Sequence, residues 1–121
     1  MATQQKMKTG HGILATIRLR EWAHDRAALR TGRTTNYQRS GWRERRQRDA
    51  DAAIVRVVDF ENTLAQLTPH QQQILTLAYL CGYSQEETAA LTHTNPLSIA
   101  YSIQRAREAL AEALDRRNLL Y

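Results

Sequence analysis

The sequence predicts an all-α protein in which two longer helices precede a C-terminal unit of three helices. Only five of the 121 residues are glycine and two are proline. No stretch alternates apolar and polar side chains as a half-buried strand does. Three helix start signals also follow one another in the last third of the chain. The length is that of one ordinary domain, so little room is left for a second independent core.

Composition narrows the class of protein further. Hydrophobic residues make up 42% and charged residues 24%, which is typical of a soluble globular protein. No run approaches the roughly 20 apolar residues of a membrane span, and the first residues, MATQQKMKTGHG, lack the apolar core of a signal peptide. We therefore expect a cytoplasmic protein with no membrane partner. The single cysteine, Cys81, excludes an internal disulfide and a cysteine-rich metal site, and we expect it to be a small buried hydrophobe.

The first long helix is predicted over residues 12–29. Two neighbouring apolar patches predict that its buried face is wide. The patches consist of Ile13, Leu14 and Ile17, and of Ala15, Leu19, Trp22 and Ala23. The segment that follows, TGRTTNYQRSG (31–41), holds two glycines and three threonines without any periodicity. It is predicted to be a loop.

The second long helix is predicted to begin near Trp42, and its two halves differ in character. The first half, WRERRQRDAD, is almost purely polar and carries four arginines. The second half carries apolar side chains at helical spacing, namely Ala53, Ile54, Val57, Val58 and Leu64, with Phe60 beside them. We expect this helix to pack at its C-terminal end and to project its charged end into solvent or onto a partner.

Charge is distributed unevenly behind the formal net value of +5. Residues 18–48 carry ten arginines against three acids, whereas residues 49–121 carry five arginines against nine acids. A basic block, built from arginine rather than lysine, indicates an acidic partner such as nucleic acid. The alternative is a solvated surface that only keeps the protein soluble. The candidate phosphate contacts in this block are Arg33, Arg39, Arg43, Arg45 and Arg46.

Three start signals organise the last third of the chain. Thr68-Pro69 with Gln71 is a capping box with a first-turn proline, Ser84 with Glu87 is a second box, and Asn95-Pro96 is a third cap. Gly82 is suited to the left-handed residue that ends the first of these helices. The third helix is long and carries one apolar face, made of Ile99, Ile103, Ala106, Leu110, Ala113 and Leu114. Two short helices, a tight turn and a longer helix make a helix-turn-helix.

The run LTPHQQQILTLAYLCGYSQEETAALTHTNPLSIAYSIQRAREAL resembles region 4 of the sigma-70 family, particularly the extracytoplasmic-function type. The matching features are the Leu-Thr-Pro start, Gly82, Ser84, Glu86-Glu87 and the Arg-Ala-Arg ending at 105–107. Response-regulator output domains share the first half of this pattern, and the Arg-Ala-Arg ending favours the sigma type. The resemblance covers roughly fifty residues. It implies a region 4-like domain over 67–121, and the charge and helix patterns predict a basic N-terminal helical region over 1–66.

The resemblance also implies a function and a set of partners. It implies a DNA-binding transcription regulator that acts at promoters, with promoter DNA and RNA polymerase as partners. The groove-facing candidates are Asn95, Leu97, Ser98, Tyr101, Ser102 and Arg105. The sequence departs from the family at Ala100 and Ser102, where a lysine and an arginine are usual, at His93, often a glycine, and at Thr88, usually Ile or Val. The sequence therefore leaves open whether this helix contacts bases or has lost that contact.

Two other functions share the predicted fold. One is a protein-interaction module that binds RNA polymerase or a sigma factor without contacting bases, and the other is a phage DNA-packaging recognition subunit. No enzyme is expected, because the histidines lack metal-ligand spacing, no glycine-rich phosphate loop is present, and Glu86-Glu87 lie where acids favour the helix dipole. We thus expect no catalytic residue, metal or cofactor. A homodimer is one arrangement that the sequence allows, since such proteins often pair to match two half-sites.

Overall fold

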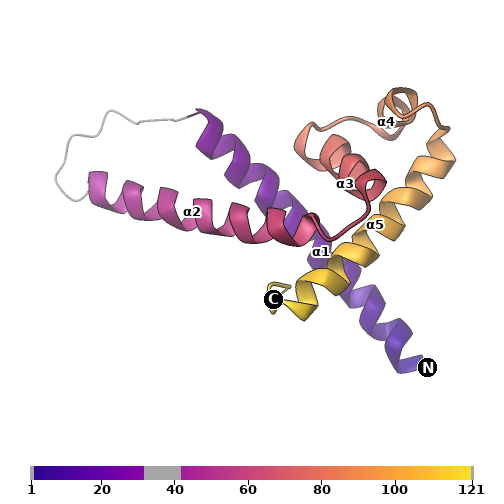
Figure 1. Ribbon diagram of the computed structural model, residues 1–121, viewed down its shortest axis with the longest axis horizontal. Coiled ribbons are helices and arrows are strands. Elements are labelled where there is room, and N and C mark those ends of the chain that lie inside the picture. Colours follow the sequence, from indigo (N-terminus) through magenta and orange to yellow (C-terminus); the bar gives the residue numbers. More distant parts are fainter. Residues whose placement is uncertain (1, 32–41, 121) are drawn as a thin grey trace.

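A computed structural model describes the backbone over residues 2–31 and 42–120, and within these ranges the chain is helical with no strand. The all-α prediction is therefore confirmed. The helices are α1 (Ala2–Thr31), α2 (Trp42–Leu64), α3 (Pro69–Leu75), α4 (Gln85–Leu91) and α5 (Pro96–Arg116), with a π-helical turn over Thr76–Leu80 after α3. Figure 1 shows α1 and α2 as a long pair, while α3, α4 and the start of α5 form a smaller unit at the other end.

Most predicted boundaries agree with the structure. The second helix starts at Trp42 and the last three start at Pro69, Gln85 and Pro96, each directly after its predicted cap. The first helix is longer than predicted, because it begins at Ala2 rather than near residue 12. The added turns are rich in Gln, Lys and Met, which favour helix. Of the segment predicted as a loop, residues 32–41 lie outside the described residues.

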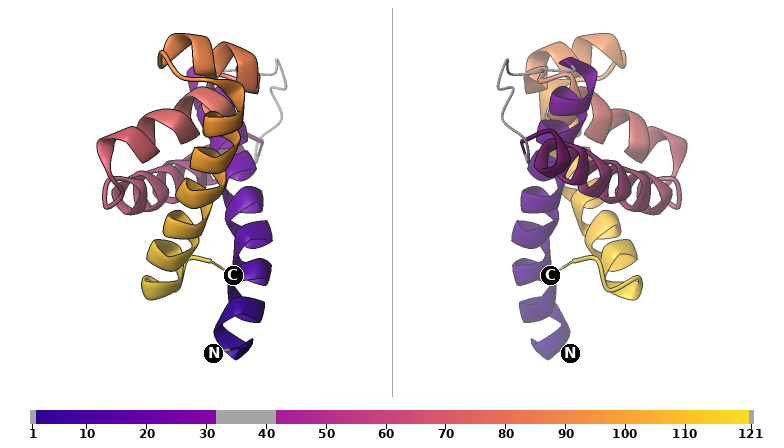
Figure 2. Two further views of the ribbon diagram at one scale, coloured as in Figure 1. Left: turned by 90° about the vertical axis from the view of Figure 1, so that its right-hand side faces the viewer. Right: turned by 90° about the vertical axis from the view of Figure 1, so that its left-hand side faces the viewer.

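One large hydrophobic core joins the two ends of the sequence. α1 packs along α5, and Figure 2 shows the two helices side by side. The core residues come from α1, α2, α3, α5 and the segments that follow α2 and α5: Ala15, Leu19, Trp22, Val57, Phe60, Leu64, Leu67, Leu75, Ala106, Leu110, Ala111, Ala113, Leu114 and Leu120. A smaller cluster of Ile74, Ala89 and Ile99 holds α3, α4 and α5 together. The large core thus contains residues from both sides of the predicted domain boundary between residues 66 and 67. The division of the chain into two domains stays a prediction.

The buried face of the long helices is narrower than predicted. In α1 the residues Ala15, Leu19 and Trp22 are buried, whereas Ile13 and Ile17 are exposed. In α2 the predicted Ile54 and Val58 are likewise about half exposed, at 47% and 50%. The reason is that α1 contacts its neighbours along one row of side chains spaced by three or four residues, and the adjacent row lies outside the contact.

The prediction that Cys81 is buried is wrong, because the structure exposes it. Cys81 ends the π-helical turn, where its backbone amide donates to the carbonyl of Thr76 at 3.0 Å. A π turn adds one residue to the turn, so later positions shift around the helix axis and Cys81 leaves the buried face. Leu75, just before this turn, is fully buried instead. Gly82 then takes the predicted left-handed conformation, with φ of 75°.

Polar contacts fix α1 against α2. The Arg26 guanidinium donates to both carboxylate oxygens of Glu61, at 2.7 and 2.8 Å, and Trp22 Nε1 donates to the same carboxylate at 3.0 Å. Arg56 binds Asp25 in the same two-point manner, at 2.9 and 3.0 Å. These paired geometries are the strongest form of charged hydrogen bond. The resulting contact orients the pair of long helices.

Candidate nucleic-acid interface

The turn between α4 and α5 sets the position of α5, the recognition helix of the predicted helix-turn-helix. The amide of Thr94 donates to the carbonyl of Ala89 at 2.8 Å, and the Thr92 hydroxyl donates to the carbonyl of Thr88 at 2.8 Å. Between them His93 has φ of 58°, a conformation that glycine adopts without strain. In the region 4 pattern that the sequence resembles, this turn position is often glycine. This chain therefore makes the same turn with a strained residue.

The start of α4 is held by the predicted capping box. The Ser84 hydroxyl accepts from the amide of Glu87 at 3.1 Å, and the Glu87 carboxylate accepts from the amide of Ser84 at 3.0 Å. The Ser84 amide and hydroxyl hold the pKa of Glu87 below its ordinary value, because they bind the charged form. Farther along α4, Thr88 is fully buried and its Oγ1 has no hydrogen-bond partner. The position at which the resemblance to region 4 predicts Ile or Val thus holds a buried hydroxyl without a hydrogen-bond partner.

Asn95, one of the predicted groove-facing side chains, caps α5. Its Oδ1 accepts from the amide of Ser98 at 2.9 Å. A bidentate contact to adenine needs the oxygen and the nitrogen of an amide together. Because the oxygen is engaged in the cap, Asn95 in this conformation lacks that two-point contact. The cap explains why Asn95 is present without requiring a role in base recognition.

The exposed face of the first turns of α5 is mainly apolar and aromatic. Leu97 is 85% exposed and Tyr101 is 61% exposed. Ser98 is exposed, while Ala100 and Ser102 are half-buried. The structure therefore brings the predicted groove-facing residues Leu97, Ser98 and Tyr101 to one accessible end of α5. Ser102 lies closer to the neighbouring helices.

The two arginines of the Arg-Ala-Arg ending have different partners. Arg105 donates to the Tyr101 hydroxyl at 3.2 Å, and its guanidinium carbon lies 5.5 Å from the centre of that ring, within the range of a cation–π contact. Arg107 donates instead to the Tyr79 hydroxyl at 3.3 Å, which ties α5 to the π-helical turn. Arg105 is thus a surface cation, whereas Arg107 has a structural contact. The sequence pattern gave no signal for the Arg107–Tyr79 pair.

The predicted phosphate contacts of the N-terminal block are only partly described. Arg33 and Arg39 lie outside the described residues, and for Arg43 the backbone alone is described. Arg45 is exposed and Arg46 half-buried in the first turns of α2. Figure 1 places this end of α2 far from α4 and the start of α5, along the longest axis of the molecule. The candidate residues therefore form two separate surfaces.

Some arginines of the basic block act within the protein. Arg26 pairs with Glu61, as described above. Arg18 pairs with Glu21 at 3.3 Å and also donates to the backbone carbonyl of Leu120 at 3.2 Å, which ties α1 to the end of the chain. Counting arginines in the sequence consequently overstates the positive charge offered to a partner.

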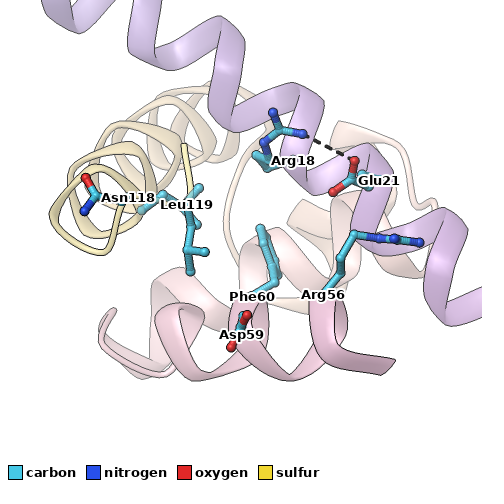
Figure 3. Close-up of a pocket in the computed structure, with 8 residues that line it drawn as sticks. Arg18, Glu21, Arg56, Asp59, Phe60, Asn118 and Leu119 are labelled. Carbon is cyan, nitrogen blue, oxygen red and sulfur yellow. Dashed lines mark hydrogen bonds and ion pairs between the residues drawn. The ribbon is translucent and has the colours of Figure 1, made fainter. Parts of the chain in front are cut away.

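A cavity of about 310 Å³ lies between α1, α2 and the residues after α5. Figure 3 shows Arg18 on α1, and Phe60 and Arg56 next to each other on α2 across from it. Both arginines already bind carboxylates, since Arg18 pairs with Glu21 and Arg56 with Asp25. The cavity is therefore a gap at a helix junction, and both of its cations already have a carboxylate partner, Arg18 within α1 and Arg56 across to α1.

In the described part of the chain, no three or more His, Cys, Asp or Glu side chains lie close enough together to hold a metal ion. None of its helices combines the length and the apolar character that a membrane crossing needs.

α3, α4 and α5 form a helix-turn-helix whose last helix is exposed at its start. Residues 58–110 match the family model of sigma-70 region 4. The C-terminal part of the chain is therefore a sigma region 4-like helix-turn-helix, a class of unit that acts in DNA binding and transcription regulation. The match begins in the last turns of α2 and ends within α5, so it covers slightly under half of the chain. Comparison with curated proteins and with solved structures gave no match.

Proposed function

We propose that the protein is a transcription regulator that binds promoter DNA through α5 and acts together with RNA polymerase. The observation that carries this proposal is the region 4 match over a helix-turn-helix whose second helix exposes Leu97, Tyr101 and Arg105. A helix in this position of the motif enters the major groove, while its neighbours contact the backbone. Arg105, next to Tyr101 on the exposed face, is suited to a phosphate contact.

The test compares Arg105→Ala with Arg116→Ala, an exposed arginine at the far end of the same helix. Binding of the full chain to a labelled promoter duplex is measured by fluorescence anisotropy over a range of salt concentrations. Loss of one phosphate contact is expected to weaken binding and to reduce the slope of log K against log salt by about one. Arg116→Ala is expected to behave like the unaltered protein. No DNA binding by the unaltered protein even at low salt would contradict the proposal.

The first turns of α2 are proposed as a second contact, to DNA that flanks the site. Arg45 and Arg46 lie there, at the opposite end of the long axis from the start of α5. A DNA duplex bound by α5 reaches these two arginines only if it extends along the long axis of the protein. The variant Arg43/Arg45/Arg46→Ala is therefore expected to weaken binding to a duplex of about 40 base pairs, and to leave binding to one of about 15 base pairs unchanged. An equal loss on both lengths would contradict this second contact.

A second candidate function is a module that binds RNA polymerase or a sigma factor without contacting bases. The observation that favours it is the composition of residues 96–104, PLSIAYSIQ, which contain no arginine or lysine. Anisotropy with purified polymerase, in the absence of promoter DNA, separates the two functions. Polymerase binding without DNA binding supports this module. DNA binding that Arg105→Ala weakens, without polymerase binding, rules it out.

The oligomeric state separates the remaining candidates. A homodimer is proposed for the regulator, because paired units match two half-sites. A phage DNA-packaging recognition subunit would instead form a ring. Light scattering on the full chain in solution measures the mass of the oligomer directly. The mass of a ring would favour the packaging subunit over the regulator.

A further inference from the structure

The exposed end of α5 has an unusual chemistry for a helix that enters a DNA groove. Leu97 is 85% exposed, the largest value among the large hydrophobic side chains that the structure describes. Leu97 and Tyr101 are four residues apart, and Ala100 lies between them, so the three share one face. This face, which we call the Leu97 face, follows directly after the cap of α5. An isolated exposed leucine on most surfaces needs no explanation, but this one lies where the helix-turn-helix meets its target.

Two side chains beside the Leu97 face already have hydrogen-bond partners within the protein. The Asn95 oxygen accepts from the amide of Ser98 at 2.9 Å. The Tyr101 hydroxyl accepts from Arg105 at 3.2 Å, and the guanidinium lies over the ring. Hydrogen-bond recognition of a base pair depends on donors and acceptors that are available together. What the Leu97 face offers to a groove is therefore mainly apolar surface.

The major groove contains one apolar group, the C5-methyl of thymine. An exposed leucine at the start of a recognition helix is complementary to that methyl, and the small side chain of Ala100 leaves room beside it. We infer that Leu97 is a specificity residue that contacts a thymine methyl group in the major groove. This inference rests on the proposed DNA-binding function and names the chemical feature of the DNA that the helix recognises.

The test removes the methyl group from the DNA and the side chain from the protein. The probes are a 24-base-pair duplex of alternating adenine and thymine and the same duplex with deoxyuridine in place of thymidine. Binding of the full chain is measured by anisotropy at low salt. Burial of one methyl-sized group corresponds to about a four-fold difference in affinity, so the unaltered protein is expected to bind the thymine duplex at least that much more tightly.

Leu97→Ala is expected to bind both duplexes equally, at the affinity that the unaltered protein has for the deoxyuridine duplex. Because Leu97 is exposed, this variant keeps the fold, which helical circular dichroism checks. Leu91→Ala is the matched control, since Leu91 is also an exposed leucine of the helix-turn-helix. It is expected to keep the four-fold preference. The double comparison cancels any effect of deoxyuridine on DNA shape, because that effect is common to all three proteins.

Several outcomes would overturn the inference. Equal binding of both duplexes by the unaltered protein would leave DNA binding intact and exclude methyl recognition. A preference as large in Leu97→Ala as in the unaltered protein would exclude Leu97 as the residue that contacts the methyl group. A Leu97→Ala variant that binds DNA normally but RNA polymerase weakly would assign the Leu97 face to a protein partner. Absence of binding to either duplex and to promoter DNA would instead remove the proposed function itself.

Discussion

The α1–α2 pair and the helix-turn-helix are stabilised by different kinds of contact. Between α1 and α2 the contacts join residues 31 to 39 positions apart: Arg56 to Asp25, Arg26 to Glu61, and Trp22 to Glu61. The Trp22 and Phe60 rings also stack, with centres 5.1 Å apart. In the helix-turn-helix each helix starts with a cap whose partners lie three residues apart. The first region thus depends on tertiary contact, whereas the second is specified locally.

Because the two regions are stabilised by different contacts, different substitutions should destabilise each of them. α5 belongs to both, because its first half joins the small cluster of the helix-turn-helix and its second half joins the large core with α1 and α2. A change in the second half of α5 should therefore disturb the whole molecule. A substitution whose contacts lie in only one of the two regions should show how much those contacts contribute to stability.

The largest effect is expected for Leu110→Ala, at a fully buried position of the large core. Removing this side chain leaves a cavity and is expected to lower the free energy of unfolding by about 3 kcal/mol. Urea unfolding followed by circular dichroism measures the change. Leu97→Ala, also on α5 but exposed, is the control and should leave stability nearly unchanged. A loss below about 1 kcal/mol for Leu110→Ala would contradict the joint core.

A smaller loss is expected for Glu61→Ala, which acts on the α1–α2 pair alone. It removes the two-point partner of Arg26 and leaves Trp22 Nε1 without its acceptor. Because both charged side chains are partly exposed, solvent screens the pair, and we expect a loss of about 1–2 kcal/mol. Glu112→Ala, at an exposed acid of α5, is the matched control. Equal stability of the two variants would show that the Glu61 contacts contribute nothing measurable.

Within the helix-turn-helix, Thr88→Val is expected to stabilise the protein. It replaces an unpaired buried hydroxyl with a methyl group of similar size, which should raise the free energy of unfolding by about 1 kcal/mol. Thr92→Val is a control of opposite sign, because it removes a hydroxyl that donates to the Thr88 carbonyl at 2.8 Å. Thermal unfolding of both variants shows whether each substitution raises or lowers the stability of the protein. A destabilised Thr88→Val variant would mean that its hydroxyl has a partner.

The smallest effect concerns the Glu87 cap and appears only in acid. The folded protein lowers the pKa of Glu87 below its ordinary value of 4.5. The stability that the charged cap contributes is therefore fully present above about pH 4.5 and is lost as the pH falls through the lower, folded pKa. Glu87→Gln keeps a capping side chain that does not ionise, so its loss of stability over this range should be smaller. Glu86→Gln, one position away from the cap contact, should retain the loss.

The helix-turn-helix was predictable because its signals are local. Thr68, Ser84 and Asn95 each cap the helix that the sequence predicted, since a cap needs only a side chain and an amide three residues later. Even the unusual His93 lies at the turn where a glycine was expected. The candidate site was less predictable, because exposure and hydrogen-bond partners depend on distant residues. Asn95 is engaged in its cap and Arg107 binds Tyr79.

The all-α class, the order of the helices and the helix-turn-helix with its capped starts all follow from local sequence patterns. The packing of the helices was needed to show which apolar side chains of α1 and α2 are buried, that Cys81 is exposed, and which arginines join helices rather than face a partner. These two groups of features differ in the range over which their interactions act. Caps and glycine turns act over three to five residues, whereas burial and ion pairing depend on how whole helices cross. For that reason Leu97, recognised in the sequence as one of several candidates, became the distinctive residue only when its surroundings were known.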